Sequence, residues 1–319
     1  MSRLEELLTG GKRVVTAELP IADGASPAVV EEPVAALLGA VDAIGVTDNA
    51  GAHAHASSLA VASLVRRAGA EPIMNLACRD RNRLALQAAL LGASLHGIEN
   101  VLCVTGDDVT SGDEPQTRRV FDLDSPQLLS VAGTLQEGTF LSGRPIEPSP
   151  HFFLGAVENP IAPPLEYRAD RAAKKVRAGA RFFLLQAVFE LGSLAAFLER
   201  VGTLGLFERA YFLPSICILR SAKQLRYMHD HVAGVSVPAA LLAEAETLSR
   251  EAQRSWCFEQ SVTLAEQALS LPGVSGLHLI PLGGPQLALD LLAHLDAPVN
   301  LPRPVVSKER DEKDSRVTA

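Results

Sequence analysis

Cysteine is scarce in this chain. Its four cysteines, Cys78, Cys103, Cys217 and Cys257, are far apart and form no C-x-x-C pair. Neither a disulfide framework nor a zinc knuckle is therefore indicated, and we expect buried thiols in a cytoplasmic protein.

A basic block and a long apolar run are also absent. The formal net charge is −8, which argues against a nucleic-acid partner. No window reaches the length of a membrane span, and the N-terminus has no secretory signal. Aromatic residues make up only 5% of the chain, whereas alanine and leucine are abundant. This composition favours packed helices over a β-sandwich and predicts no membrane contact.

No G-x-G-x-x-G follows the first apolar run, which argues against a dinucleotide-binding doubly wound sheet. Eight short apolar runs instead alternate with longer amphipathic stretches, the pattern of a (β/α)8 TIM barrel. The runs predict strands at 13–19, 42–48, 71–78, 100–106, 151–157, 181–187, 209–216 and 276–280. The stretches predict helices at 27–40, 56–69, 81–96, 125–137, 165–179, 191–204, 220–232 and 285–295. We expect one barrel domain over 1–305, a helical insertion at about 238–271 before the last strand, and a charged, disordered tail at 306–319.

In a barrel the chemistry lies where strands end and βα loops begin. The residues at these points are mainly carboxylates and amides, which suit a neutral, hydrogen-bonding heterocycle better than a phosphosugar. They are Glu18, Thr47, Asp48, Asn49, Asn75, Cys78, Asp80, Thr105, Asp107, Asp108, Asn159, Gln186, Glu190, Ser215 and His278.

The remaining motifs give weaker indications of function. The pairs His53/His55 and His229/His231 are typical of surface segments, so we expect no metal site. Ser215 lacks a G-x-S-x-G elbow, which argues against a serine hydrolase. No predicted strand contains the lysine that a Schiff-base aldolase needs. The Gly-Gly-Pro turn at 283–285 follows the eighth strand, where many barrels bind phosphate, so a phosphate group is one candidate ligand there.

Taken in chain order, the strand ends resemble the methylenetetrahydrofolate reductase family over roughly residues 13–296. The similar segments are TAELP (16–20), VTDNAG (46–51), NLACRDRNR (75–83), GIENVLCVTGDD (97–108), KVRAGARFFLLQAVFE (175–190), FLPSICILRSAKQL (212–225) and GLHLIPL (276–282). The resemblance implies a cytoplasmic barrel flavoprotein of one-carbon metabolism and methionine biosynthesis. Such an enzyme reduces 5,10-methylenetetrahydrofolate to 5-methyltetrahydrofolate through FAD, with NAD(P)H or another electron donor.

The same resemblance assigns roles in catalysis and in substrate binding. Glu18 would be the general acid that opens the substrate's five-membered ring to an iminium ion. Asp107 would contact the substrate and stabilise that cation. Gln186 would bind the pterin edge, and Leu219 stands near the position of the family's folate-stacking aromatic. The alternatives are a strand-end ion pair for Glu18, a turn aspartate for Asp107 and a structural amide for Gln186. We read Asp108 as a solvated loop charge.

The positions implied for the cofactor are Thr47, Asn75, Val104, Thr105, Gly106, Ala156 and Lys175. Plain packing, capping or a solvated helix lysine are the alternatives there. Two of these residues depart from the family pattern: Asn75 replaces a histidine, and Thr105 replaces an arginine. The segment AVENPIAPP also lacks the expected tyrosine. These changes remove charge-assisted and stacking contacts to the cofactor and the folate.

Several functions therefore stay open. The first is a flavin-dependent folate reductase. The second is a flavin-free reductase, or a methyl-handling subunit that a separate electron-transfer subunit supplies. The third is a non-catalytic folate-binding barrel. All of them share a reduced folate as the partner, and a homo-oligomer is compatible with each.

Overall fold

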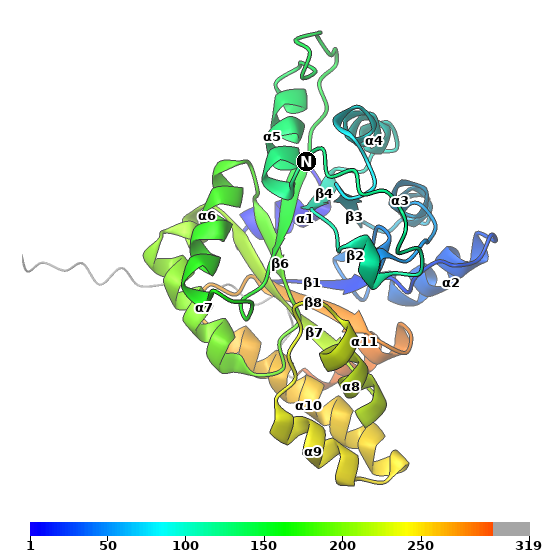
Figure 1. Cartoon of the computed structure of the whole chain (residues 1–319), viewed down its shortest axis with the longest axis vertical. Coiled ribbons are helices and arrows are strands. Elements are labelled where there is room, and N and C mark those ends of the chain that lie inside the picture. The colour runs from blue at the N-terminus through cyan, green and yellow to red at the C-terminus, as the bar shows by residue number, and fades with distance from the viewer. Residues whose placement is uncertain (296–319) are drawn as a thin grey trace, which may run out of the picture.

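The structure is a computed structural model that describes residues 1–295. Eight parallel strands close into a barrel in chain order (Figure 1), so the predicted (β/α)8 fold is confirmed. The strands are β1 (Val14–Glu18), β2 (Ala43–Val46), β3 (Pro72–Ala77), β4 (Asn100–Val104), β5 (Phe153–Glu158), β6 (Phe182–Leu185), β7 (Tyr211–Ile218) and β8 (Gly276–Pro281). The predicted tail at 306–319 and the last part of the predicted domain lie outside the described residues.

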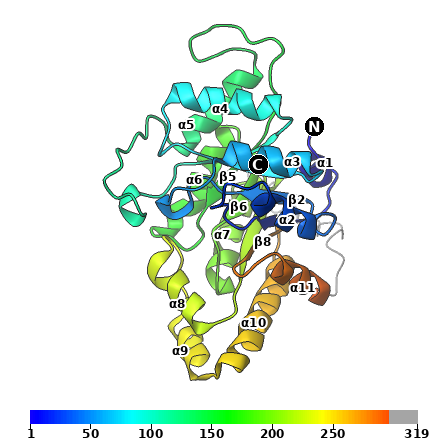
Figure 2. The ribbon, with the colours of Figure 1, turned by 90° about the vertical axis from the view of Figure 1, so that its right-hand side faces the viewer.

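Helices separate the strands and surround the barrel (Figures 1 and 2). The α-helices are α1 (Arg3–Thr9), α2 (Ala28–Leu37), α3 (Ser58–Arg67), α4 (Arg83–Leu95), α5 (Ser125–Gln136), α6 (Arg168–Arg177), α7 (Leu191–Thr203), α8 (Ala222–His231), α9 (Ala239–Thr247), α10 (Arg250–Ser270) and α11 (Gln286–His294). Short 3-10 turns are η1 (Ala50–Ala52), η2 (Val109–Ser111), η3 (Leu165–Tyr167) and η4 (Leu206–Glu208). Within residues 1–295, no helix combines the length and apolarity needed to cross a membrane.

The insertion predicted at 238–271 contains α9 and α10. Together with α8 these helices project from one side of the barrel (Figures 1 and 2). They pack around a second apolar cluster, which includes Leu225, Leu242 and Cys257. The end of β7 runs into this cluster through Cys217 and Leu219.

Apolar side chains fill the interior of the barrel near the strand N-termini. Phe153 of β5 stacks on Phe182 of β6, with ring centroids 5.0 Å apart. Gly155 makes room for this stack, since a Cβ there would lie 2.3 Å from the Phe182 ring. Leu4 and Leu8 of α1, both fully buried, pack in the same inner cluster. Polar side chains are thereby left to the opposite, C-terminal mouth.

The sequence reading missed α1. Its start carries a recognisable signal, because Ser2 stands three residues before Glu5 in the S-x-x-E spacing of a capping box. The Ser2 side chain accepts a hydrogen bond from the Glu5 backbone N–H at 3.1 Å. A seven-residue helix shows too little periodicity to be recognised by pattern alone.

Candidate active site

Glu18 ends β1 at the C-terminal mouth, and its side chain is 29% exposed. A buried histidine, His278 of β8, lies beneath it, with His278 Nε2 3.9 Å from Glu18 Oε2. The second ring nitrogen, Nδ1, lies 2.8 Å from Thr16 Oγ1. The parallel register places Thr16 and His278 side by side on adjacent strands. Glu18 is thus a reachable carboxyl above a fixed imidazole.

His278 has a polar contact at each ring nitrogen. Its Nδ1 lies 2.8 Å from the Thr16 hydroxyl, and its Nε2 faces Glu18. The contact with Thr16 holds the orientation of the ring. Glu18 therefore stands over an imidazole whose orientation is held.

Asp107 follows β4 in an exposed turn. One of its carboxylate oxygens, Oδ2, accepts the Gly51 backbone N–H at 3.1 Å. Gly106 precedes it with φ +94°, and a Cβ there would lie 2.8 Å from Arg79 Cβ. The structural role considered for Asp107 is therefore present in the turn. Its predicted contact with substrate stays a prediction.

Arg79 holds three βα loops together, a role that sequence reasoning missed. Its guanidinium is almost fully buried and pairs with Asp80 at 2.8 Å. It also donates to the backbone carbonyls of Asn49 at 3.0 Å and Asp107 at 3.3 Å. Burial alone would raise the pKa of Asp80, but the hydrogen bonds from Arg79 and Asn49 hold it below the usual range. Arginine is therefore present beside the Gly-Asp turn, although Thr105 replaces the family's arginine in the sequence.

A second arginine makes a similar tie. Asp48, in the VTDNAG segment, is buried and accepts the Ala77 backbone N–H at 2.8 Å. Arg81 reaches the same carboxylate with both terminal nitrogens, at 2.6 and 3.1 Å. The loops after β2 and β3 are thereby fixed to each other. Asp48 and Asp80, two acids at the mouth, are therefore both paired with arginines.

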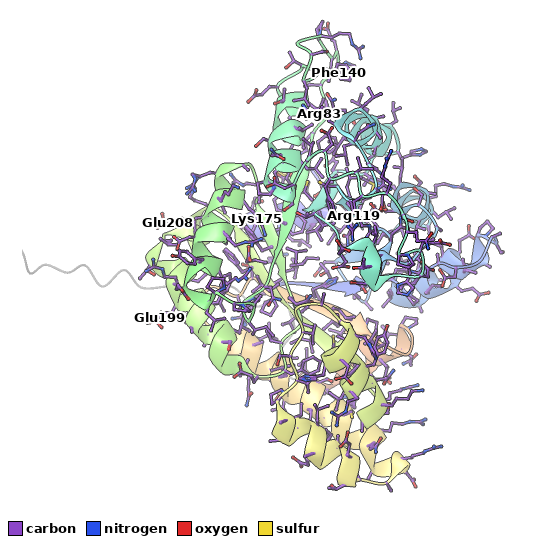
Figure 3. All side chains as sticks on the ribbon, in the orientation of Figure 1. Arg83, Arg119, Phe140, Lys175, Glu199 and Glu208 are labelled. Atoms are coloured by element: carbon purple, nitrogen blue, oxygen red, sulfur yellow. The ribbon has the colours of Figure 1, made fainter. Side chains whose placement is uncertain are left out.

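Asp108 is an exposed loop charge, and it is paired with an arginine. Arg119, labelled in Figure 3, reaches both of its carboxylate oxygens at 2.7 Å. Asp108 also caps η2 through the Thr110 N–H. The Arg119 hydrogen bonds, followed by those from Thr110, hold the pKa of Asp108 well below its usual value.

Four of the predicted cofactor positions are half-buried at the mouth: Thr47, Asn75, Val104 and Gly106. Asn75 is in register with Leu102, a member of the inner cluster, so its side chain faces the barrel interior. Its Oδ1 is buried and has no hydrogen-bond partner among the described residues. An unpaired buried amide oxygen is costly unless a ligand supplies a donor.

Several predicted cofactor positions have structural roles. Thr105 Oγ1 accepts the Ser125 N–H at the start of α5. Gly106 lies beneath Arg79. Ala156 is fully buried and in register with Cys103, in the cluster between strands and helices. Its side chain therefore points toward the helices, away from the barrel interior.

Lys175 belongs to a buried ion pair (Figure 3). Its Nζ lies 2.8 Å from Glu158 Oε2 and also donates to the Val157 carbonyl. Lys175 is 5% exposed and Glu158 is 2% exposed. Burial lowers the pKa of Lys175, although the attraction of Glu158 opposes that shift. The predicted contact with a pyrophosphate stays untested, and the contact that the structure shows is with Glu158.

The two remaining substrate candidates meet the α8–α9 region. Gln186 Nε2 donates to the Ala233 carbonyl at 3.3 Å, and the neighbouring Asn159 donates to Gly234 at 2.7 Å. A segment at 232–238 therefore lies over the ends of β5 and β6. Leu219 is buried and lines a cavity of about 160 Å³ between β7, α7 and α8–α10.

All four cysteines are buried and free, as the sequence predicted. Burial raises the pKa of each thiol, for Cys78 to about 12. None of them is poised as a nucleophile at neutral pH.

Comparison with known proteins agrees with the resemblance. A protein from Clostridium thermocellum, described as binding two copies of 5-methyl-5,6,7,8-tetrahydrofolic acid, has the same fold with a TM-score of 0.65 and 13% identity. The match covers 92% of this chain and 97% of that one. A 2,3-dimethylmalate lyase (TM-score 0.47, 12% identity, 91% and 83% covered) and a tryptophan synthase from M. tuberculosis (0.43, 15%, 82% and 98%) are too distant to inform function.

The sequence profile named methylenetetrahydrofolate reductase matches residues 35–296. This match includes seven of the eight strands and every predicted site residue except Glu18. The chain therefore belongs to the methylenetetrahydrofolate reductase family.

Proposed function

We propose that this chain binds a reduced folate at the C-terminal mouth of the barrel and reduces 5,10-methylenetetrahydrofolate to 5-methyltetrahydrofolate. The observation that carries the proposal is Glu18, a partly exposed carboxyl above the buried His278–Thr16 pair. Family membership supports the substrate class. The folate bound by the structural neighbour supports it as well.

Glu18 would act as the general acid. It donates its proton to the amine nitrogen that leaves when the five-membered ring opens, and the methylene carbon becomes part of an iminium ion. A hydride then adds to that carbon, and the electrons of the C=N bond return to the pterin nitrogen. The product carries a methyl group, and Glu18 is left as a carboxylate. A proton from solvent, which reaches this partly exposed side chain, restores the acid for the next turnover.

Two amides are suited to hold the pterin ring. Asn75 Oδ1 needs a donor and faces the barrel interior, so a ring N–H or amino group would satisfy it. Gln186 can both donate and accept at the pterin edge. Its donor now contacts the 232–238 segment at 3.3 Å, a long hydrogen bond that a ligand can replace.

The residues predicted for FAD do not fit a dinucleotide. Lys175, the one cation among them, is paired with buried Glu158. Thr105 caps a helix, and Ala156 faces away from the mouth. We therefore derive no step through a flavin. These contacts favour the second candidate, in which hydride comes directly from a nicotinamide or electrons come from a separate subunit.

Three measurements on the purified protein test the proposal. Calorimetry with 5-methyltetrahydrofolate should show binding. The visible spectrum should gain no protein-bound flavin bands when FAD is added. With NAD(P)H and 5,10-methylenetetrahydrofolate, Glu18→Gln should lose roughly 100-fold or more in rate while folate binding persists. Glu32→Gln, which changes an exposed helix carboxylate, is the matched control and should keep the full rate.

Each result can contradict one part of the proposal. Absence of folate binding removes the whole function. An unchanged rate in Glu18→Gln removes the acid. A bound flavin removes the direct donor and restores the flavoprotein. Folate binding with no turnover from any donor leaves a methyl-handling or purely folate-binding barrel.

A further inference from the structure

Arg220 lies two residues after the end of β7, and its side chain has no hydrogen-bond or ion-pair partner within residues 1–295. It takes part in none of the ion pairs found within residues 1–295, and its Nε is buried without a hydrogen-bond acceptor. A buried guanidinium donor without an acceptor is costly. The arginines of the opposite loops, Arg79 and Arg81, are both paired with aspartates. Arg220 therefore differs from them in having no anionic partner among the described residues.

The turn after β8 supports the stem of this arginine. A Cβ at Gly283 would lie 3.6 Å from Arg220 Cδ, an ordinary van der Waals distance, so the turn lies beside the stem of Arg220. Gly284 has φ +110° and open space where a side chain would stand. Helix α11 begins two residues later without a side-chain cap and without an acid in its first turn. Its first backbone N–H groups add to the positive field at this place.

Gln224 fixes the two loops to each other. Its Oε1 accepts the Arg220 backbone N–H at 2.7 Å, and its Nε2 donates to the Leu282 carbonyl at 2.7 Å. The main chain at Arg220 is thereby held beside the glycine turn. A guanidinium on a fixed backbone loses less conformational entropy when it binds an anion.

We propose that Arg220 and the Gly283–Gly284 turn form a subsite for an anionic group of the ligand, namely a carboxylate of the folate's glutamate tail. This inference rests on the proposed function. The subsite lies on β7 and β8, and β8 is the neighbour of the β1 strand that carries Glu18. The end of β8 separates the subsite from Glu18, so a folate with its one-carbon unit at Glu18 can place its tail at Arg220. The planar guanidinium suits a carboxylate in two-point contact.

The same position in other barrels takes phosphate, so the test must separate the two sources of the anion. The experiment compares 5-methyltetrahydrofolate with the corresponding reduced pteroate, which lacks the glutamate, by calorimetry. Arg220→Gln should weaken the folate roughly 10- to 100-fold and leave the pteroate unchanged. Arg220→Lys keeps the charge but loses the two-point contact of the guanidinium. Its affinity for folate should lie between those of the native protein and Arg220→Gln. Lys223→Gln, an exposed cation one turn away, should change neither ligand.

Other outcomes overturn the inference. Equal folate affinity in Arg220→Gln and the native protein, with an unchanged circular dichroism spectrum, shows that the tail does not bind there. If Arg220→Gln loses FAD or pyrophosphate binding but not folate binding, the anion is a phosphate. If the native protein binds neither folate nor pteroate, the proposed function fails. Pyrophosphate titration of both proteins then decides whether Arg220 is an anion site, and equal binding would exclude it.

Discussion

The ion pair between Lys175 and Glu158 predicts a loss of stability when the lysine is replaced. Lys175→Met keeps the buried stem but removes the ammonium group 2.8 Å from Glu158 Oε2. The carboxylate is then left 2% exposed, with Arg168 still 3.5 Å from its other oxygen. Breaking a buried pair usually costs about 3–5 kcal/mol. Because Arg168 remains, we expect the lower end of that range.

A loss of this size is measurable by urea unfolding followed by circular dichroism. It corresponds to a fall in Tm of roughly 6–10 °C. Lys174→Met, which removes an exposed neighbour on α6, is the matched control and should stay within about 0.5 kcal/mol of the native protein. The double variant Lys175→Met/Glu158→Gln should recover part of the loss, because the unpaired carboxylate charge is then removed and Arg168 keeps its hydrogen bonds to backbone carbonyls.

The alternative is the cofactor role that the family resemblance implies for Lys175. It predicts a variant of native stability that fails to bind a dinucleotide. The pair's expected cost is well above about 1 kcal/mol. If the free energy of unfolding of Lys175→Met lies within about 1 kcal/mol of the native value, the ion pair does not hold α6 to the barrel. Our reason for separating this lysine from the active site is then wrong.

Three further predictions concern the mouth and the thiols. Asn159→Ala removes the 2.7 Å bond to the Gly234 carbonyl. If the 232–238 segment must move aside for folate to bind, this variant should speed folate association about fivefold in stopped flow, since one such bond is worth about 1 kcal/mol. An unchanged association rate would contradict that movement. Asp80→Asn should lower the free energy of unfolding at pH 7 but not in acid. The Arg79 partnership holds the pKa of Asp80 in the folded protein below 3.8. The stabilisation from Asp80 is therefore full above that value and is lost as pH falls through the lowered pKa. The four buried cysteines should resist a thiol reagent until the protein unfolds, and rapid labelling of the native state would refute their burial.

The barrel was predictable because each element carries its own pattern. Every predicted strand overlaps an observed one, since short apolar runs and longer amphipathic ones differ in period and length. The face of each residue is harder to predict, because a shift of one position reverses it. Ala156 shows this: Gly155 and Val157 take the inward positions of β5, and Ala156 is turned toward the helices.

The strand-end rule found the carboxylates but not their partners. Asp80 and Asp108 were visible at the mouth, whereas Arg79 and Arg119 become their partners only through the paths of the loops. The adjacent charges Asp107 and Asp108 illustrate the result. Each is compensated separately, the first by a backbone amide of the η1 loop and the second by an arginine eleven positions later. No pattern in the sequence predicts contacts of this kind, since loop conformation decides them.

The mouth of the barrel is divided by how its charges are used. On the side of β2 to β4, arginines and aspartates neutralise one another and tie the loops together. On the side of β7, β8 and β1, Glu18 is partly exposed and Arg220 has no partner within the described residues. A ligand gains little by displacing a satisfied ion pair, but it gains a charge-assisted contact where a group is unpaired. In the proposed function, proton transfer and recognition of the anionic tail therefore fall on the same side of the barrel, where the charged groups are not already paired.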